Sequence, residues 1–242
     1  DFGLSNLPQY TMAVTGTGLS EGTKYENLRI AANMMVFRTG PIVRIDDNIN
    51  SLAELKGKRL PYGFKAAPLF AFIGDAILAN AGLTIKDGKA VPVVALRQHW
   101  DIFKEGKIDY VIAAVGTGVL TEMNASIPGG IKYLSMDASD EAVKRTLAIF
   151  PGSYLAEVQP AKPLVGVLQP VNVFHYDYLI WTHKGASDEV VYKVVKALYD
   201  NEQDLKEAGP LWRSHASKTM GKDHGLDYHP AAVKFYKEAG LR

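Results

Sequence analysis

Short apolar segments, each followed by a stretch of helical periodicity, dominate the middle of the chain. The apolar segments are residues 58–62, 91–96, 109–115 and 132–136, and the helical stretches are 64–81, 99–105, 119–125 and 140–150. Such alternation produces βαβ units, whose strands run in the same direction because each helix carries the chain back along the sheet. It therefore predicts the α/β class, with mostly parallel sheets and helices on both faces.

The alternation stops after residue 150. Pro160, Pro163 and Pro170 interrupt an extended segment that ends in the β-branched and aromatic residues 171–182. Upstream, the pattern predicts two strands, residues 28–37 and 41–45, joined by a Gly-Pro turn. We interpret the extended segment after residue 150 as a crossing between two lobes, one formed by residues 58–165 and the other by 1–57 with 166–242. A discontinuous lobe of this kind suits a hinge around a cleft.

Composition excludes several classes of function. The chain has 27 Lys+Arg against 26 Asp+Glu, so no basic surface for a nucleic acid is expected. It has no Cys, which excludes disulfides, a thiol nucleophile and Cys-ligated zinc in this sequence. Because no apolar run approaches the roughly 20 residues that span a bilayer, we expect no direct membrane insertion. The start at Asp1, without Met or a leader pattern, predicts a processed or truncated chain.

Signatures of catalysis, cofactor binding and metal binding are lacking. Gly16-Thr17-Gly18 does not fit a dinucleotide fingerprint, because position 21 is Glu. A histidine-rich group near the C-terminus matches no compact metal-ligand spacing, and we interpret it as surface and capping residues; it consists of His215, His224 and His229 with Asp223 and Asp227. We therefore expect no enzymatic activity, no cofactor and no metal.

Three predicted strand-to-helix turns contain glycine or hydroxyl residues and are candidates for anion binding. The residues chosen as ligand contacts are Ser5 and Asn6 in the first turn, Gly63, Phe64, Lys65 and Ala66 in the second, and Gly116 and Thr117 in the third. Helix N-termini have unpaired amide N–H groups that meet anions, and such turns lie where ligands bind in parallel sheets. Lys65 or Arg38 would add a charge-assisted contact to a carboxylate. The alternative is that these turns only cap helices, as Ser5 is expected to cap residues 7–13.

Aromatic residues gather near the predicted hinge. Phe174, Tyr176 and Tyr178 share one face of a strand, His175 and Asp177 share the other, and Phe37 and Phe64 are expected nearby. These rings would form a wall of the ligand pocket, with a Tyr hydroxyl orienting the ligand. The alternative is that they pack in the core under the hinge.

Several segments in collinear order resemble the TAXI-type solute receptors of tripartite ATP-independent periplasmic (TRAP) transporters. They are Leu28-Arg29-x-Ala31-Ala32-Asn33, Val43-Arg44, residues 51–59 (SLAELKGKR), Pro151-Gly152-x-Tyr154, Tyr176-Asp177-Tyr178-Leu179, residues 188–198 (DEVVYKVVKAL) and His229-Pro230-x-x-x-Lys234-x-Tyr236-Lys237-Glu238. The resemblance covers essentially the whole chain. The segment at 51–59 is common to many type II periplasmic binding proteins, and the two C-terminal segments are more specific.

The resemblance implies a two-lobed, Venus-flytrap type II periplasmic-binding-protein fold that closes on a small solute. The implied function is the extracytoplasmic, periplasmic solute-binding subunit of a TRAP transporter, whose partners are the membrane permease subunits. Its ligand would be a carboxylate-bearing organic acid or amino acid, with glutamate-like, oxo-acid and dicarboxylate ligands all left open. Two alternatives remain: an enzyme on the same fold, similar to pyrimidine-precursor synthases, and a ligand-sensing module of a signalling protein.

Overall fold

Residues 2–242 are described by a computed structural model, and Asp1, the expected processed start, lies outside them. The chain divides into two compact units, which we call unit 1 (up to Phe37, and Tyr176–Arg242) and unit 2 (Arg38–His175). The sequence led us to expect divisions at 57/58 and 165/166. The observed divisions fall inside two long strands, β2 (Leu28–Arg44) and β8 (Val171–His183), each of which continues from one unit into the other.

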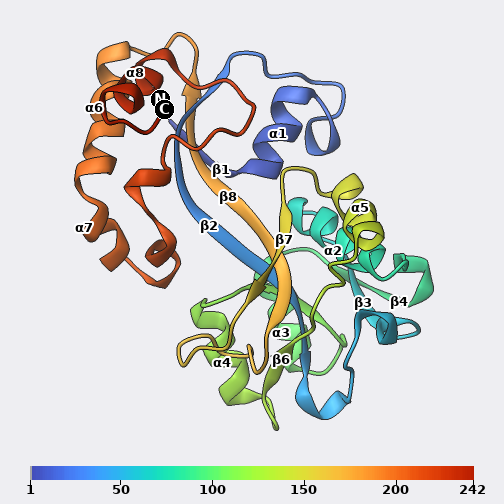
Figure 1. Cartoon of the computed structure of the whole chain (residues 1–242). Coiled ribbons are helices and arrows are strands. Elements are labelled where there is room, and N and C mark those ends of the chain that lie inside the picture. The colour runs from blue at the N-terminus through green and yellow to red at the C-terminus, as the bar shows by residue number, and fades with distance from the viewer. Residues whose placement is uncertain (1) are drawn as a thin grey trace. The chain divides into compact units, whose positions relative to one another are not determined.

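The remaining elements follow the chain in the order shown in Figure 1. Unit 1 also contains β1 (Gly3–Asn6), α1 (Leu7–Thr15), α6 (Asp188–Asp200), α7 (Glu202–Glu207) and α8 (Pro230–Glu238). Unit 2 also contains β3 (Arg59–Gly63), α2 (Leu69–Asn80), β4 (Lys89–Val93), α3 (Leu96–Lys104), β5 (Val111–Ala114), α4 (Gly118–Ser126), β6 (Ile131–Tyr133), α5 (Asp140–Ile149) and β7 (Tyr154–Val158). Within residues 2–242, no helix has both the length and the apolar character needed to cross a bilayer.

The sheets differ from the expected parallel arrangement. In the six-stranded sheet, β5 and β6 pair with β2, and β1 and β7 pair with β8, and all four pairs are antiparallel. β3 and β4 form a parallel pair, in a separate two-stranded sheet. The prediction of mostly parallel sheets is therefore corrected. Alternating strands and helices indicate the direction of successive strands but do not determine which strands pair. Here β5 and β6 both pair with β2, which runs in the opposite direction.

β2 is one continuous strand through Gly40 and Pro41, where two strands joined by a turn were predicted. A Cβ atom on Gly40 would lie 2.6 Å from Val173 Cγ1 on β8, which is closer than real side-chain contacts allow. Pro41 lacks an N–H, but its carbonyl still accepts a hydrogen bond from the Leu134 amide at 3.0 Å. Glycine is thus required at position 40 by close packing of β8, and the Gly-Pro pair does not form a turn.

Gly40→Ala is expected to destabilise the protein by about 1–2 kcal/mol, because the added methyl group overpacks a closed part of unit 2. Urea unfolding followed by circular dichroism measures the change. Val173→Ala removes the opposing methyl groups, so the double variant should be more stable than the sum of the two single effects predicts. Strict additivity of the two changes would contradict this account of Gly40.

The helices of unit 1 begin and end at local signals. Asn6, not Ser5, caps α1, because its Oδ1 accepts the Gln9 amide at 2.9 Å, and the predicted Ser5 cap is corrected. Ser187, followed by Asp188 and Glu189, predicts the start of a helix, and its side chain caps α6. The spacing of Val191, Val194, Val195, Leu198 and Leu205 predicts an apolar stripe, of which Val191 and Val195 are buried and pack in a core shared with α8. These helices form where the sequence indicates, since capping depends on neighbouring residues alone.

In unit 2, α2 and α5 lie side by side (Figure 1). Asn80, at the end of α2, joins them: its side-chain amide donates to the Asp137 carbonyl and to Thr146 Oγ1, and its Oδ1 accepts the Asp137 amide at 2.8 Å. Because all these groups are satisfied, a buried Asn can hold the two helices together.

Candidate functional site

The second predicted turn, residues 63–67, has most of its amide donors occupied. Gly63 and Phe64 both have positive φ angles, 103° and 47°, which fold the chain sharply after β3. The Phe64 and Ala66 amides donate to the carbonyls of Val93 and Val94, each at 2.8 Å. The end of β4 therefore takes donors that were expected to face a ligand.

The side chains of this turn have different environments. The Phe64 ring is buried and packs against Phe70 and, edge to face, against His99 with ring centroids 5.1 Å apart. Lys65 is exposed, and none of the described residues forms an ion pair with it. Ligand contact by Gly63, Phe64, Lys65 and Ala66 stays a prediction.

The third predicted turn presents free amide groups at the start of α4. Gly116 has φ 84°, and Thr117 is the residue before the helix, with its hydroxyl donating to the Ala114 carbonyl at 2.8 Å. The amides of Gly118 and Val119 occupy the first two helical positions, which have no partner within a helix. No other acceptor for these two amides occurs in the part of the chain that the structure describes. This turn therefore retains the property that made it a candidate, a positive helix end with unpaired donors.

Arg38 lies on the strand beside this turn. Its carbonyl accepts the Val115 amide at 2.7 Å, one residue before Gly116. Its side chain is half-buried, and no described residue forms a hydrogen bond or ion pair with the guanidinium. Adjacent strands lie about 5 Å apart, so a side chain as long as that of Arg38 has the reach to meet a ligand at the turn. We call Arg38 and the amides of Gly118 and Val119 the candidate anion site.

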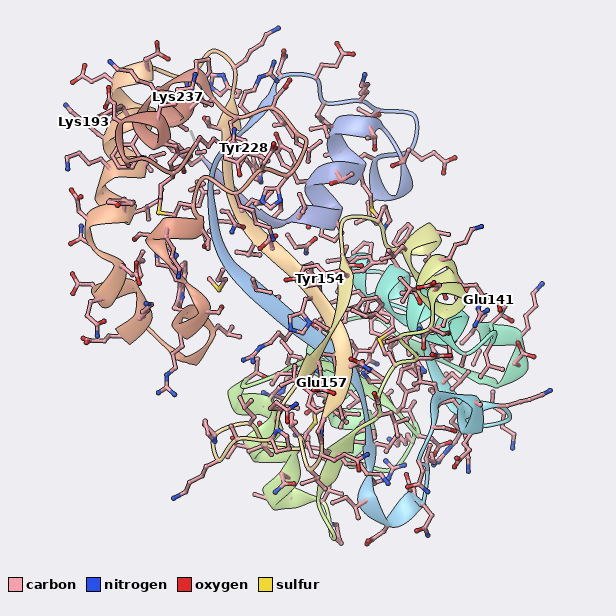
Figure 2. The ribbon with its side chains drawn as sticks, in the orientation of Figure 1. Glu141, Tyr154, Glu157, Lys193, Tyr228 and Lys237 are labelled. Atoms are coloured by element: carbon pink, nitrogen blue, oxygen red, sulfur yellow. The ribbon has the colours of Figure 1, made fainter. Side chains whose placement is uncertain are left out.

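The charge of Arg38 acts on His175, and Tyr154 packs against His175. Burial lowers the pKa of His175, and the charge of Arg38 lowers it further. A hydrogen bond of 3.2 Å from His175 Nδ1 to the Val173 carbonyl acts in the opposite direction. Tyr154 lies on β7 beside β8 (Figure 2). Its ring centroid is 5.5 Å from that of His175. His175 is therefore held neutral, and Arg38 supplies the positive charge of this cluster.

Unit 1 holds Ser5, Asn6, Phe37, Tyr176 and Tyr178 of the remaining predicted residues. Ser5 lies in β1 and its hydroxyl accepts a hydrogen bond from Trp181 Nε1 at 3.1 Å, while the Asn6 side chain is occupied in capping α1. Phe37 stacks on Tyr176 with ring centroids 6.0 Å apart and contacts Tyr178 at 5.1 Å. The predicted grouping of these three rings is thus observed, and their contact with a ligand stays a prediction.

Phe174 does not join that group. It belongs to unit 2, its side chain is fully buried, and its ring meets Phe150 edge to face at 5.4 Å. The sequence predicts that Phe174 shares a strand face with Tyr176, but the Phe174 side chain lies in the packed core of unit 2. For this ring the structure favours the core-packing alternative.

An ion pair around Asp177 was not predicted. The Lys222 ammonium lies 2.6 Å from Asp177 Oδ2, and His224 Nδ1 lies 3.8 Å from the same oxygen. Both Asp177 and His224 are buried, so His224 is not the surface residue that we expected. Lys222 is 45 residues from Asp177 along the chain, and no local pattern links them.

The other histidines have structural roles. His229 caps α8 as predicted, its Nδ1 accepting the Ala231 amide at 3.3 Å. His215 is buried, contrary to expectation, and its Nδ1 meets the Met34 carbonyl at 2.5 Å. Among residues 2–242, no group of three or more His, Asp or Glu side chains is arranged to hold a metal ion.

Comparisons with known proteins agree with this architecture. The model of a family described as NMT1-like matches residues 1–240. A TctC solute binding protein from Polaromonas superposes with a TM-score of 0.53 and 16% identity, covering 99% of this chain and 75% of that one. The desulfurization enzyme DszB gives a TM-score of 0.54 and 13% identity, with 99% and 79% covered.

A periplasmic sulfonate-binding protein from Methylobacillus flagellatus KT is considerably longer than this chain. It matches at 15% identity with a TM-score of 0.49, and 86% of this chain covers 52% of that protein. This chain thus spans about half the length of that relative and about three quarters of the other two. The superpositions show that the chain has a mixed α/β fold of the periplasmic-binding-protein type, as predicted.

Proposed function

The chain belongs to the NMT1-like family, and we propose that it is a solute-binding protein that recognises a small carboxylate-bearing compound. The observation that carries this proposal is the candidate anion site, in which two unpaired amides at the start of α4 lie beside the strand of the unpaired Arg38. No catalytic signature accompanies this site. Binding without chemistry is the function that such an arrangement supports best.

The ligand class follows from the donors. A carboxylate oxygen accepts hydrogen bonds from amide N–H groups at a helix N-terminus, where the helix dipole adds about 0.3–1 kcal/mol. A guanidinium makes two parallel hydrogen bonds with the two oxygens of a carboxylate. His175, kept neutral by burial, offers no competing positive charge. An organic acid or an amino acid such as glutamate satisfies these donors.

The transport setting is a further part of the proposal. The segments that resemble TAXI-type receptors support a periplasmic subunit that delivers its ligand to the membrane permease subunits of a TRAP transporter. The TctC protein, itself named a solute binding protein, shares the fold and so supports the solute-binding role. Under this proposal, a ligand would be passed on unchanged.

Replacing Gly118 by proline is expected to weaken carboxylate binding by about 10- to 100-fold, the value of one charge-assisted hydrogen bond. Proline removes the amide donor at the first helical position, where helices tolerate it. Thr117 already has φ −81° and ψ 148°, the conformation that a residue before proline prefers. Isothermal titration calorimetry with glutamate, succinate and 2-oxoglutarate measures the loss for whichever acid binds the original protein.

Gly118→Ala is the matched control, since a Cβ atom at this position meets nothing within 4 Å and the amide stays in place. It should bind the acid as the original protein does. Arg38→Gln should also weaken binding, and it should abolish the preference for the acid over its neutral amide. The proposal fails if Gly118→Pro and Gly118→Ala bind equally, or if only neutral or cationic compounds bind the original protein.

An enzyme on the same fold is a second candidate, favoured by the superposition on DszB. Any such enzyme would have to act without a cysteine nucleophile, because the sequence contains no Cys. Incubation of the protein with the acid that it binds, followed by mass spectrometry, separates the two. Recovery of the unchanged acid supports binding, and conversion of the acid supports the enzyme.

A further inference from the structure

A row of three side chains crosses one face of the sheet in unit 2. Tyr154 on β7 pairs directly with His175 on β8. Gly40 on β2 lies against Val173 on β8, because a Cβ atom at position 40 would be 2.6 Å from Val173 Cγ1. β2 enters unit 2 and β8 leaves it, so these neighbouring strands run in opposite directions. Two residues away on each strand, Arg38 therefore stands opposite His175 on that same face.

The start of α4 lies on the same face as this row. The Arg38 carbonyl accepts the Val115 amide at 2.7 Å, so Val115, just after β5, neighbours Arg38 on the side away from β8. On α4, the Leu120 side chain packs into a hydrophobic core that it shares with Val115 and Val173. Val173 and His175 are two residues apart on β8 and point to one face of the sheet. In the order of the strands, Arg38 thus stands between the free amides of α4 and the two rings.

Tyr154 supplies an accessible aromatic surface at the end of this row. It is 40% exposed, whereas His175 is 9% exposed. The centroids of the two rings are 5.5 Å apart, and the ring planes are tilted by 30°. A ligand ring that covers Tyr154 would remove apolar surface from water and could stack with an offset, the arrangement that aromatic pairs prefer.

Resting on the proposed function, we propose that the carboxylate-bearing ligand is an aryl carboxylate and that Tyr154 selects it. The carboxylate accepts hydrogen bonds from the Arg38 guanidinium and from the amides of Gly118 and Val119, while the aryl ring packs on the Tyr154 ring. β2 and β7 both neighbour β8, so their backbones lie two strand spacings apart, about 10 Å. Both side chains are long and extend from the same face, so an acid with two carbons between its ring and its carboxylate has the length to contact both.

The test compares acids of equal charge by isothermal titration calorimetry: 3-phenylpropionate, 3-cyclohexylpropionate and propionate. The phenyl acid should bind about 3- to 10-fold more tightly than the cyclohexyl acid, which is the value of one aromatic pair beyond the area that it buries. Both should bind more tightly than propionate, because each buries additional apolar surface. The neutral amide of the phenyl acid should bind roughly tenfold more weakly, since it cannot form the charge-assisted pair with Arg38.

Three variants locate the selecting ring. Tyr154→Leu keeps apolar bulk but removes the ring, so the preference for the phenyl acid over the cyclohexyl acid should fall below about twofold. Tyr154→Phe keeps a ring and should keep the preference. Tyr62→Leu is the matched control, because Tyr62 is 53% exposed and lies on β3 in the separate sheet. It should leave the preference as it is in the original protein, and thermal unfolding followed by circular dichroism checks that each variant is folded.

Gly118→Pro separates this inference from the proposed function, because it should weaken binding of both ring acids and leave the ratio of their affinities unchanged. The inference is overturned, and the proposed function stands, if the two ring acids bind the original protein equally tightly while Gly118→Pro still weakens binding. Retention of the full preference by Tyr154→Leu has the same meaning. If none of the acids binds, glutamate and succinate included, the proposed function and this inference both fail.

Discussion

Asp109→Ala is expected to lower the free energy of unfolding by about 2–4 kcal/mol, towards the lower end of what breaking a buried ion pair costs. Asp109 is only 8% exposed, and it lies at the centre of a charge cluster in unit 2. Its carboxylate accepts the Arg59 backbone amide at 2.6 Å and the Arg59 Nε at 3.1 Å, and Arg44 lies 3.4 Å away. Because the Arg59 side chain is 43% exposed, solvent screens that part of the interaction.

The loss has two causes. The Arg59 amide loses its acceptor, and the Arg44 guanidinium, 13% exposed, keeps Asp47 at 2.8 Å as its one charged partner among residues 2–242. Burial opposes ionisation of Asp109, but hydrogen bonds and charge from Arg59, with a contribution from Arg44, hold its pKa below the ordinary value. A lowered pKa means that the stabilisation is present above the unfolded-state pKa and is lost as the pH falls through the folded-state pKa.

Urea unfolding at pH 7 measures the effect. Asp101→Ala is the matched control, because Asp101 is 40% exposed and forms surface ion pairs with Arg97 and Lys104. Exposed pairs contribute about 0–1 kcal/mol, so this variant should change little. Equal losses in the two variants would show that the buried cluster has no special role.

Acidification from pH 8 to pH 4.5 is expected to reduce stability by about 2–3 kcal/mol through His99 alone, at 1.36 kcal/mol per pKa unit. Burial lowers the pKa of His99 to about 3, since the side chain is wholly inside unit 2. Its Nε2 accepts the Ile112 amide at 3.3 Å, so the neutral ring carries its proton on Nδ1. An unfolded chain binds a proton at His99 near pH 6.5 and the folded chain does not, so stability falls as the pH drops below that value.

His99→Gln isolates this contribution, because glutamine keeps an acceptor for Ile112 and does not titrate. The difference in unfolding free energy between the original protein and the variant should shrink by the stated amount between pH 8 and pH 4.5. Burial also lowers the pKa values of His175 and His224, and both remain in the variant, so their effects cancel in the comparison. A pH-independent difference would mean that His99 takes up its proton at the same pH in the folded chain as in the unfolded chain.

Features that depend on neighbouring residues could be predicted from the sequence. The Ser187 cap, the buried stripe of α6 and the start of α8 at Pro230 all follow from patterns within one or two helical turns. The start of α4 belongs to the same class, since the first amides of any helix lack partners. For this reason the amides that follow the turn at Gly116 remain unpaired in the folded chain.

Features that depend on distant residues could not be predicted. The turn at Gly63 resembles the one at Gly116 in sequence, but the end of β4 occupies the Phe64 and Ala66 amides. The direction of strand pairing and the partners of Asp109 and Asp177 depend on which segments come together in space.

By itself, the sequence determined where helices such as α6 and α8 begin and which face of α6 is buried, because capping and helical periodicity are local. Only the tertiary structure determined which strands pair and which buried charges form ion pairs. It also requires glycine at position 40, because β8 packs closely there. Those outcomes depend on packing between residues far apart in the chain, and the burial that this packing produces keeps His99 neutral.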